Sequence, residues 1–164
     1  MQSSNAASEG TAVAIGARMT GLGGHVLKKL GDGLMALFGY PQAQENDAER
    51  AVRAALAIQR ALADLNARNA RPGAPELSAR IDIESGSVVV DAAGEVFGEA
   101  PNVAARVQAA AEPGTVLVTA SVQRQTAGLF VAEDSVTSKA CRRPLRSIAS
   151  CGRAAAAGAA ARAS

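Results

Sequence analysis

Asp32 is a carboxylate that could bind a metal ion, because it stands between Gly31 and Gly33 at the junction of two short apolar runs. Hard divalent cations such as Mg²⁺ prefer carboxylate oxygens, and a tight glycine turn would leave this carboxylate open to them. Asp and Gly are also favoured in tight turns for conformational reasons alone. Asp32 is therefore a candidate metal ligand, although the turn by itself also explains the segment.

A second polar pair, Asn102 and Arg106, lies at a helical spacing. Residues four apart share one face of a helix, so the amide and the guanidinium would project together. Such a pair could bind the oxygens of a phosphoryl group or of a ribose. Exposed polar pairs are also common on solvated helix faces, which leaves a purely structural explanation open.

These residues belong to a chain of 164 residues, long enough for one domain with a hydrophobic core. Apolar residues make up 48% of it but aromatic residues only 2%, so small and β-branched side chains must build that core. A net charge of +2 argues against a nucleic-acid-binding protein.

The sequence also lacks the signals of other protein classes. No apolar run reaches the roughly 18–20 residues of a membrane span, and the first residues do not form a secretory signal. Two cysteines, Cys141 and Cys151, indicate neither a disulfide scaffold nor a zinc site. We therefore expect a cytoplasmic protein with no membrane segment.

Apolar periodicity predicts alternating helices and strands. The runs His25–Leu30 and Leu34–Phe38 predict a hairpin, and Ala48–Ala70 predicts a long amphipathic helix that Asn46 and Glu49 would cap. A weaker helical pattern covers Thr11–Leu22. Further helices are predicted at Pro101–Ala111, with Pro101 in the first position, and at Ser121–Ala127. Further strands are predicted at Leu77–Glu84, Val88–Val90, Thr115–Thr119, Leu129–Ala132 and Leu145–Ile148.

This order of elements predicts an α/β chain, built as an α+β sandwich with helices on a mixed, largely antiparallel sheet. Within Leu77–Glu84, Ile81 and Ile83 alternate with Asp82 and Glu84, which is typical of a half-buried strand. Composition predicts disorder for residues 1–10 and for an Ala/Arg-rich tail at 151–164, with the domain between them at 11–150.

Several segments together resemble the catalytic domain of class III nucleotidyl cyclases, in its bacterial form. Lys28–Gly39 resembles the central hairpin of that family, and Asp47–Leu56 the helix that follows it. Val96–Gln108 is similar to the family's substrate-site helix, and Ala111–Val116 to the exit from it. Because these motifs keep the family's order and spacing from about Gly23 to Asp134, the chain is identified as a member.

The resemblance implies a ferredoxin-like fold of the cyclase type and a cyclisation reaction. The ribose 3′-oxygen of ATP or GTP attacks the α-phosphorus and expels pyrophosphate, assisted by two Mg²⁺ or Mn²⁺ ions. Asp32 matches the second of the family's two metal-binding aspartates. Lys28 and Glu95 match the pair that reads the purine, in a pattern similar to the one that selects ATP over GTP. Asn102 and Arg106 match the residues that orient the ribose and stabilise the transition state.

The resemblance extends to one more residue and to the assembly. Lys139 matches a triphosphate-binding lysine, although its neighbours Ser138 and Ala140 depart from the family's Leu-Lys-Gly. A head-to-tail homodimer, or a heterodimer with another cyclase domain, is implied, with cyclic-nucleotide signalling as the role.

The chain also departs from the family pattern. Only Glu9 precedes Asp32 among acidic residues, so the family's first metal aspartate and its N-terminal strand have no counterpart here. Asp82 and Asp91 stand where members usually carry glycine. We expect that the chain alone cannot assemble a two-carboxylate metal site. Two functions stay open at this point: an adenylate cyclase domain, or an inactive or half-site nucleotide-binding partner of a complete cyclase.

Overall fold

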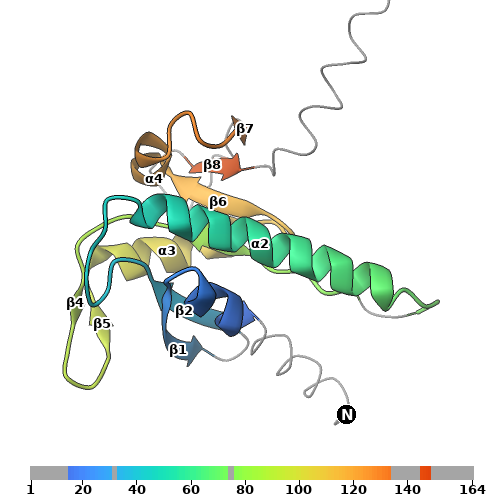
Figure 1. Ribbon diagram of the computed structural model, residues 1–164, viewed down its shortest axis with the longest axis horizontal. Helices are drawn as coiled ribbons and strands as arrows, with labels where there is room; N and C mark the ends of the chain where they lie inside the picture. The colour runs from blue at the N-terminus through green and yellow to red at the C-terminus, as the bar shows by residue number, and fades with distance from the viewer. Residues whose placement is uncertain (1–14, 31–32, 74–75, 134–144, 149–164) are drawn as a thin grey trace, which may run out of the picture. The chain divides into compact units, whose positions relative to one another are not determined.

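The computed structural model describes residues 15–30, 33–73, 76–133 and 145–148 (Figure 1). The chain divides into two compact units. One comprises Met1–Ala74 and Val90–Glu95, and the other Pro75–Val89 and Val96–Ser164. The two ends predicted to be disordered, 1–10 and 151–164, lie outside the described residues.

The first unit contains the predicted hairpin and the predicted long helix. Strand β1 (His25–Leu30) pairs antiparallel with β2 (Gly33–Leu37), and Lys28 lies opposite Met35. Residues 15–21 form a helical segment before this hairpin. Gly24 is required between the two, because a Cβ there would lie 2.8 Å from the Phe38 ring and 2.9 Å from the carbonyl oxygen of Met19.

Helix α2 (Asp47–Arg68) confirms the predicted amphipathic helix but not its predicted cap. Asn46 makes no side-chain hydrogen bond to the helix start. Instead, Asp47 accepts a hydrogen bond from the Gln44 amide at 2.7 Å and forms an ion pair with Arg50, and a carboxylate in the first turn also suits the helix dipole. The buried side of α2 is aliphatic: Val52, Ala54, Ala55, Leu56, Ile58 and Leu62.

The second unit is built on a four-stranded sheet in the order β3-β6-β8-β7. These strands are β3 (Ile81–Ile83), β6 (Val116–Thr119), β8 (Leu145–Ile148) and β7 (Ala132–Glu133). The β3–β6 pair is parallel and the other two pairs are antiparallel, so the sheet is mixed.

Some predicted elements in this half of the chain need correction. The strand predicted at Val88–Val90 is β4 (Val89–Val90), and it pairs with β5 (Val96–Phe97), a strand that was not predicted. The predicted strand Leu129–Ala132 is displaced to β7. Pro101 is the third residue of α3 (Glu99–Ala110), not the first. The fold class itself is confirmed: an α/β chain with small antiparallel and mixed sheets.

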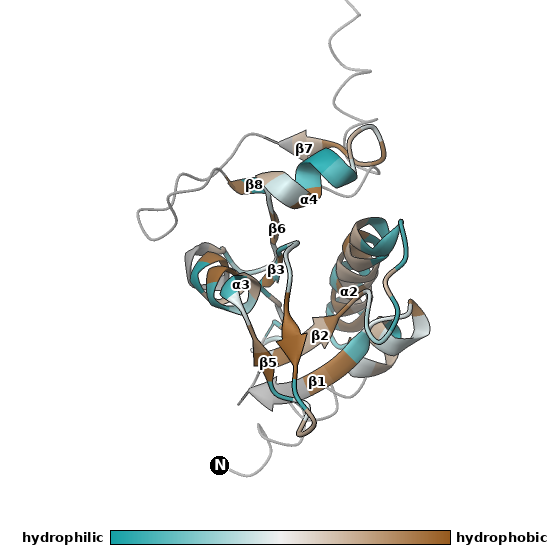
Figure 2. Cartoon of the chain, turned by 90° about the vertical axis from the view of Figure 1, so that its left-hand side faces the viewer, coloured by the Kyte–Doolittle hydropathy of each residue, from teal (hydrophilic) through white to brown (hydrophobic). Residues whose placement is uncertain are grey.

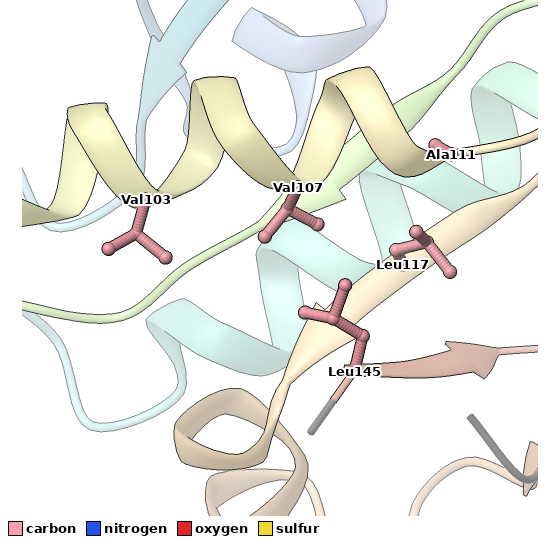
Figure 3. Packing of buried hydrophobic residues seen from close by; sticks show 5 residues of the cluster. All are labelled: Val103, Val107, Ala111, Leu117 and Leu145. Atoms are coloured by element: carbon pink, nitrogen blue, oxygen red, sulfur yellow. The ribbon is translucent and has the colours of Figure 1, made fainter. Parts of the chain in front are cut away.

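The core of the second unit lies between α3 and the sheet (Figure 3). Val103 and Val107 of α3, together with Ala111, pack on Leu117 of β6 and Leu145 of β8. The short helix α4 (Ala120–Gln125) buries Val122 and is otherwise mostly hydrophilic, as its teal colour in Figure 2 shows. None of the described helices is long and apolar enough to cross a membrane.

Shortening Leu117 to alanine should destabilise the protein by about 3 kcal/mol, because the residue is 1% exposed and its removal leaves a cavity against α3. Urea unfolding followed by circular dichroism measures the change. Leu129→Ala is the matched control, since Leu129 is 54% exposed and should change stability by less than about 0.5 kcal/mol. Equal losses in the two variants would contradict the packing described for Leu117.

Candidate active site

Helix α3 places Asn102 and Arg106 together, as their spacing predicts. Val103 and Val107 are 5% and 1% exposed and face the sheet, whereas Asn102 and Arg106 both lie on the exposed side. The backbone spacing of the helix therefore holds an amide and a guanidinium on one solvent-facing surface. Among the described residues, Arg106 forms no ion pair, so its guanidinium can bind an anion without first breaking one.

The start of α3 is fixed by Gly98. The φ angle of Gly98 is +146°, and a Cβ at this position would lie 2.9 Å from the carbonyl oxygen of Ser87, so only glycine fits. The Asn102 side chain donates a hydrogen bond to the Gly98 carbonyl at 3.1 Å. The amide thus ties the first turn of α3 to the residue that precedes it, and no described residue donates a hydrogen bond to its oxygen.

Glu95 lies at the end of the turn between β4 and β5. The Asp91 carboxylate accepts hydrogen bonds from the amides of Ala93 and Glu95, each at 2.9 Å, and the Asp91 amide donates to the Glu95 carbonyl at 3.0 Å. These bonds fix the backbone of Glu95 next to β5. Asp91 therefore organises the turn in this chain.

The other residues matched to the family's site are described incompletely or not at all. The backbone of Lys28 is part of β1, but the position of its side chain is not described. Asp32 and Lys139 lie outside the described residues. Within the described ranges, no group of three or more His, Cys, Asp or Glu side chains could hold a metal ion, so this part of the chain does not fit a pair of catalytic ions by itself.

Sequence reasoning missed the partial burial of an acidic pair, Asp82 in β3 and Glu84 directly after this strand. Asp82 and Glu84 were expected on the polar side of a half-buried strand, but that side is itself half-buried in the structure. The pKa of Asp82 is raised to about 7, mainly by burial; a backbone hydrogen bond offsets part of this rise, and the charge of Glu84 adds to it. The available signal was Asp82 itself, which stands where the resembled family carries glycine.

Comparison with known proteins relates the chain to nucleotide cyclases. The family described as "Adenylate and Guanylate cyclase catalytic domain" matches residues 19–142. The chain is 32% identical over 105 residues to the putative adenylate cyclase 3 of Rhizobium meliloti, covering 64% of this chain and 16% of that protein. It is 32% identical over 92 residues to adenylate cyclase 1 of the same organism, covering 52% and 14%. The chain thus spans about a sixth of the length of these relatives.

Solved structures give a similar result for the fold. The adenylyl cyclase CyaB from P. aeruginosa superposes with a TM-score of 0.73 at 21% identity, over 89% of this chain and 82% of that one. An adenylate/guanylate cyclase/hydrolase from Silicibacter pomeroyi superposes with a TM-score of 0.61 at 31% identity, over 82% and 76%. At 21% identity, the CyaB comparison supports the fold alone.

Proposed function

Because the chain belongs to the adenylate and guanylate cyclase catalytic-domain family, we propose that it converts ATP into 3′,5′-cyclic AMP and pyrophosphate. The observation that carries this proposal is the placement of Asn102 and Arg106 on one exposed face of α3. ATP is favoured over GTP because Lys28 and Glu95 match the purine-reading pair, and because both curated relatives carry the name adenylate cyclase.

The proposed reaction is an internal substitution at phosphorus. The ribose 3′-oxygen forms a bond to the α-phosphorus as it loses its proton, and the bond from that phosphorus to the leaving pyrophosphate breaks. Arg106 would stabilise the negative charge that grows on the α-phosphate oxygens, and Asn102 would hold the ribose so that its 3′-oxygen is aligned. Lys139 would hold the triphosphate.

Divalent ions, Mg²⁺ or Mn²⁺, assist such reactions by neutralising developing charge. The described residues contain no cluster for them, and Asp32 is the one residue matched to that role. The contribution proposed for the described residues is therefore to bind, orient and stabilise the reacting groups. Its metal requirement stays a prediction from the resemblance.

We further propose that residues 11–150 form the catalytic domain and that it works as a dimer. The resemblance assigns the metal aspartates to one subunit and Lys28, Glu95, Asn102, Arg106 and Lys139 to the other. Either a second copy or another cyclase domain would serve as partner. Cyclic-nucleotide signalling in the cytoplasm is the role that we expect for such a domain.

The test is cyclic-nucleotide production by the purified chain with Mn²⁺ and either ATP or GTP. We expect cyclic AMP from ATP and much less product from GTP. Asp32→Ala should sharply lower the yield, whereas Asp64→Asn, at an exposed position of α2, should not.

A second arm identifies the partner. The chain is mixed with a complete cyclase domain whose own Asn and Arg have been replaced, so that only a mixed dimer can hold a full set of groups. Product from the chain alone supports a homodimer, and product only in the mixture supports a heterodimer. A folded chain that yields no product in either arm would contradict the proposed function.

A further inference from the structure

A set of buried oxygen atoms lies on the sheet of the second unit, away from the exposed face of α3 that carries Asn102 and Arg106. On β3, Asp82 pairs in register with Leu117 of β6, and paired residues project from the same side of a sheet. Leu117 packs against α3 (Figure 3), so Asp82 lies on this inner side as well.

Thr119 occupies the next position on the same side, because it lies two residues beyond Leu117 and side chains two apart on a strand face the same way. Glu84 follows the end of β3, two residues after Asp82, and its charge raises the pKa of Asp82, so the two carboxylates lie near each other. Thr119 keeps extended backbone angles, φ −78° and ψ 163°, so this alternation holds up to the end of β6. Two carboxylates and a hydroxyl therefore gather where the neighbouring strands β3 and β6 end.

Two of these groups are buried without a partner. Thr119 is 2% exposed, and among the described residues nothing hydrogen-bonds to its Oγ1. The same holds for Oε2 of Glu84, whereas its Oε1 accepts a hydrogen bond from the Ser85 amide at 2.9 Å. The Ser85 hydroxyl accepts a hydrogen bond from the Gln125 side chain at 2.8 Å, and Thr119 makes no cap bond to α4.

Among the described residues, no ion pair joins Asp82 or Glu84 to a lysine or an arginine. The described ion pairs that involve Arg50 and Arg53 belong to α2, and Arg146 of β8 lies opposite Val118, on the other side of the sheet. A buried oxygen atom without a hydrogen bond destabilises the folded state, so we expect each such atom to bind a donor or a cation. Carboxylate and hydroxyl oxygens are the ligands that small hard cations prefer.

We propose that Asp82, Glu84 and Thr119 form a binding site for a divalent cation of the Mg²⁺ or Mn²⁺ class, inside the second unit and built without Asp32, the residue matched to the catalytic ions. The cation would satisfy Oε2 of Glu84 and Oγ1 of Thr119 and would neutralise the acidic pair. Its coordination would be completed by water, as is usual for Mg²⁺. This site does not depend on the proposed cyclase activity.

The test measures binding of Mn²⁺ alone, without nucleotide, by electron paramagnetic resonance of the free ion. The full chain carries Asp32→Ala, so that the residue matched to the catalytic metal does not contribute. We expect one saturable site, weakened at least tenfold by Glu84→Gln and by Thr119→Val. Thr119→Ser, which keeps the hydroxyl, and Asp64→Asn, on exposed α2, should bind like the parent.

Thermal unfolding provides a second readout on the same proteins. Mn²⁺ should raise the unfolding midpoint of the parent but not that of Glu84→Gln, since a ligand stabilises only the state that binds it. Asp82→Asn should fold without metal, because a neutral isostere removes the buried charge. The absence of saturable binding, or binding that survives Glu84→Gln and Thr119→Val unchanged, would overturn the proposal.

Discussion

Replacing Arg106 with alanine is expected to lower kcat for cyclic AMP formation by about 100- to 1,000-fold. The guanidinium lies on the exposed side of α3, and its proposed partner is the charge that develops at the α-phosphate. A donor that acts mainly in the transition state affects kcat more than KM. Initial rates over a range of ATP concentrations separate the two parameters.

The stability of this variant should be nearly unchanged, which makes its loss of rate interpretable. Arg106 is exposed and forms no ion pair with a described residue, so its removal should cost less than about 0.5 kcal/mol. Arg106→Lys keeps the charge without the planar fork and should fall between parent and alanine variant. Arg60→Ala, exposed on α2, is the matched control. An Arg106→Ala protein with full kcat would remove the residue from the proposed mechanism.

Asn102 is the less decisive position, although the resemblance assigns it a role in the same reaction. Its side chain donates to the Gly98 carbonyl and so helps to hold the first turn of α3. Asn102→Ala would lose that bond as well as any contact to the ribose. A drop in rate could then reflect a displaced helix start, so Arg106 gives the clearer result.

The elements that the sequence predicts best are those that local periodicity determines. The hairpin β1–β2 and helix α2 lie within a few residues of their predicted bounds, and β8 matches its bounds. In each case an apolar pattern of one period is interrupted by glycine or by polar residues. The relative positions of Asn102 and Arg106 follow from the same cause, because helical spacing alone sets them.

The periodicity of one segment does not predict which distant strands pair with each other. β3 pairs in parallel with β6, and β4 pairs with β5, whose two residues are too few to show any period. The alternation in β3 correctly separates Ile81 and Ile83 from Asp82 and Glu84. It does not reveal that a helix covers the acidic side, since that depends on where α3 packs. Asp32 and Lys139 lie outside the described residues and stay predictions.

Because α3 covers the side of β3 that carries Asp82, we expect the stability of the protein to depend on pH. In the folded chain the pKa of Asp82 is about 7, against an ordinary value of 3.8. Between these values the folded state keeps a proton that the unfolded state has lost, so stability should fall as the pH rises. The total loss is about 4 kcal/mol at most, reached near pH 7, with no further change from this group above it.

The surroundings of Asp82 make it the main source of this slope. Glu84, directly after β3, is the acidic neighbour along the chain, and β6 carries no charged residue. On α3, which packs against β3, the charged residues are Glu99 and Arg106, both exposed. Exposed charges are screened by water and contribute little to such a shift.

Urea unfolding of parent and Asp82→Asn from about pH 4 to about pH 8 tests this expectation. A chelator is present throughout, because a cation bound to Asp82 and Glu84 would lower the same pKa and hide the effect. The amide cannot ionise, so the variant should lose the slope and exceed the parent in stability above about pH 7. Asp64→Asn, exposed on α2, should keep the parent's slope.

Parallel curves for parent and Asp82→Asn would mean that the Asp82 carboxylate is solvated. A buried acidic pair under α3 would then be excluded, and with it the reason for a cation to bind there.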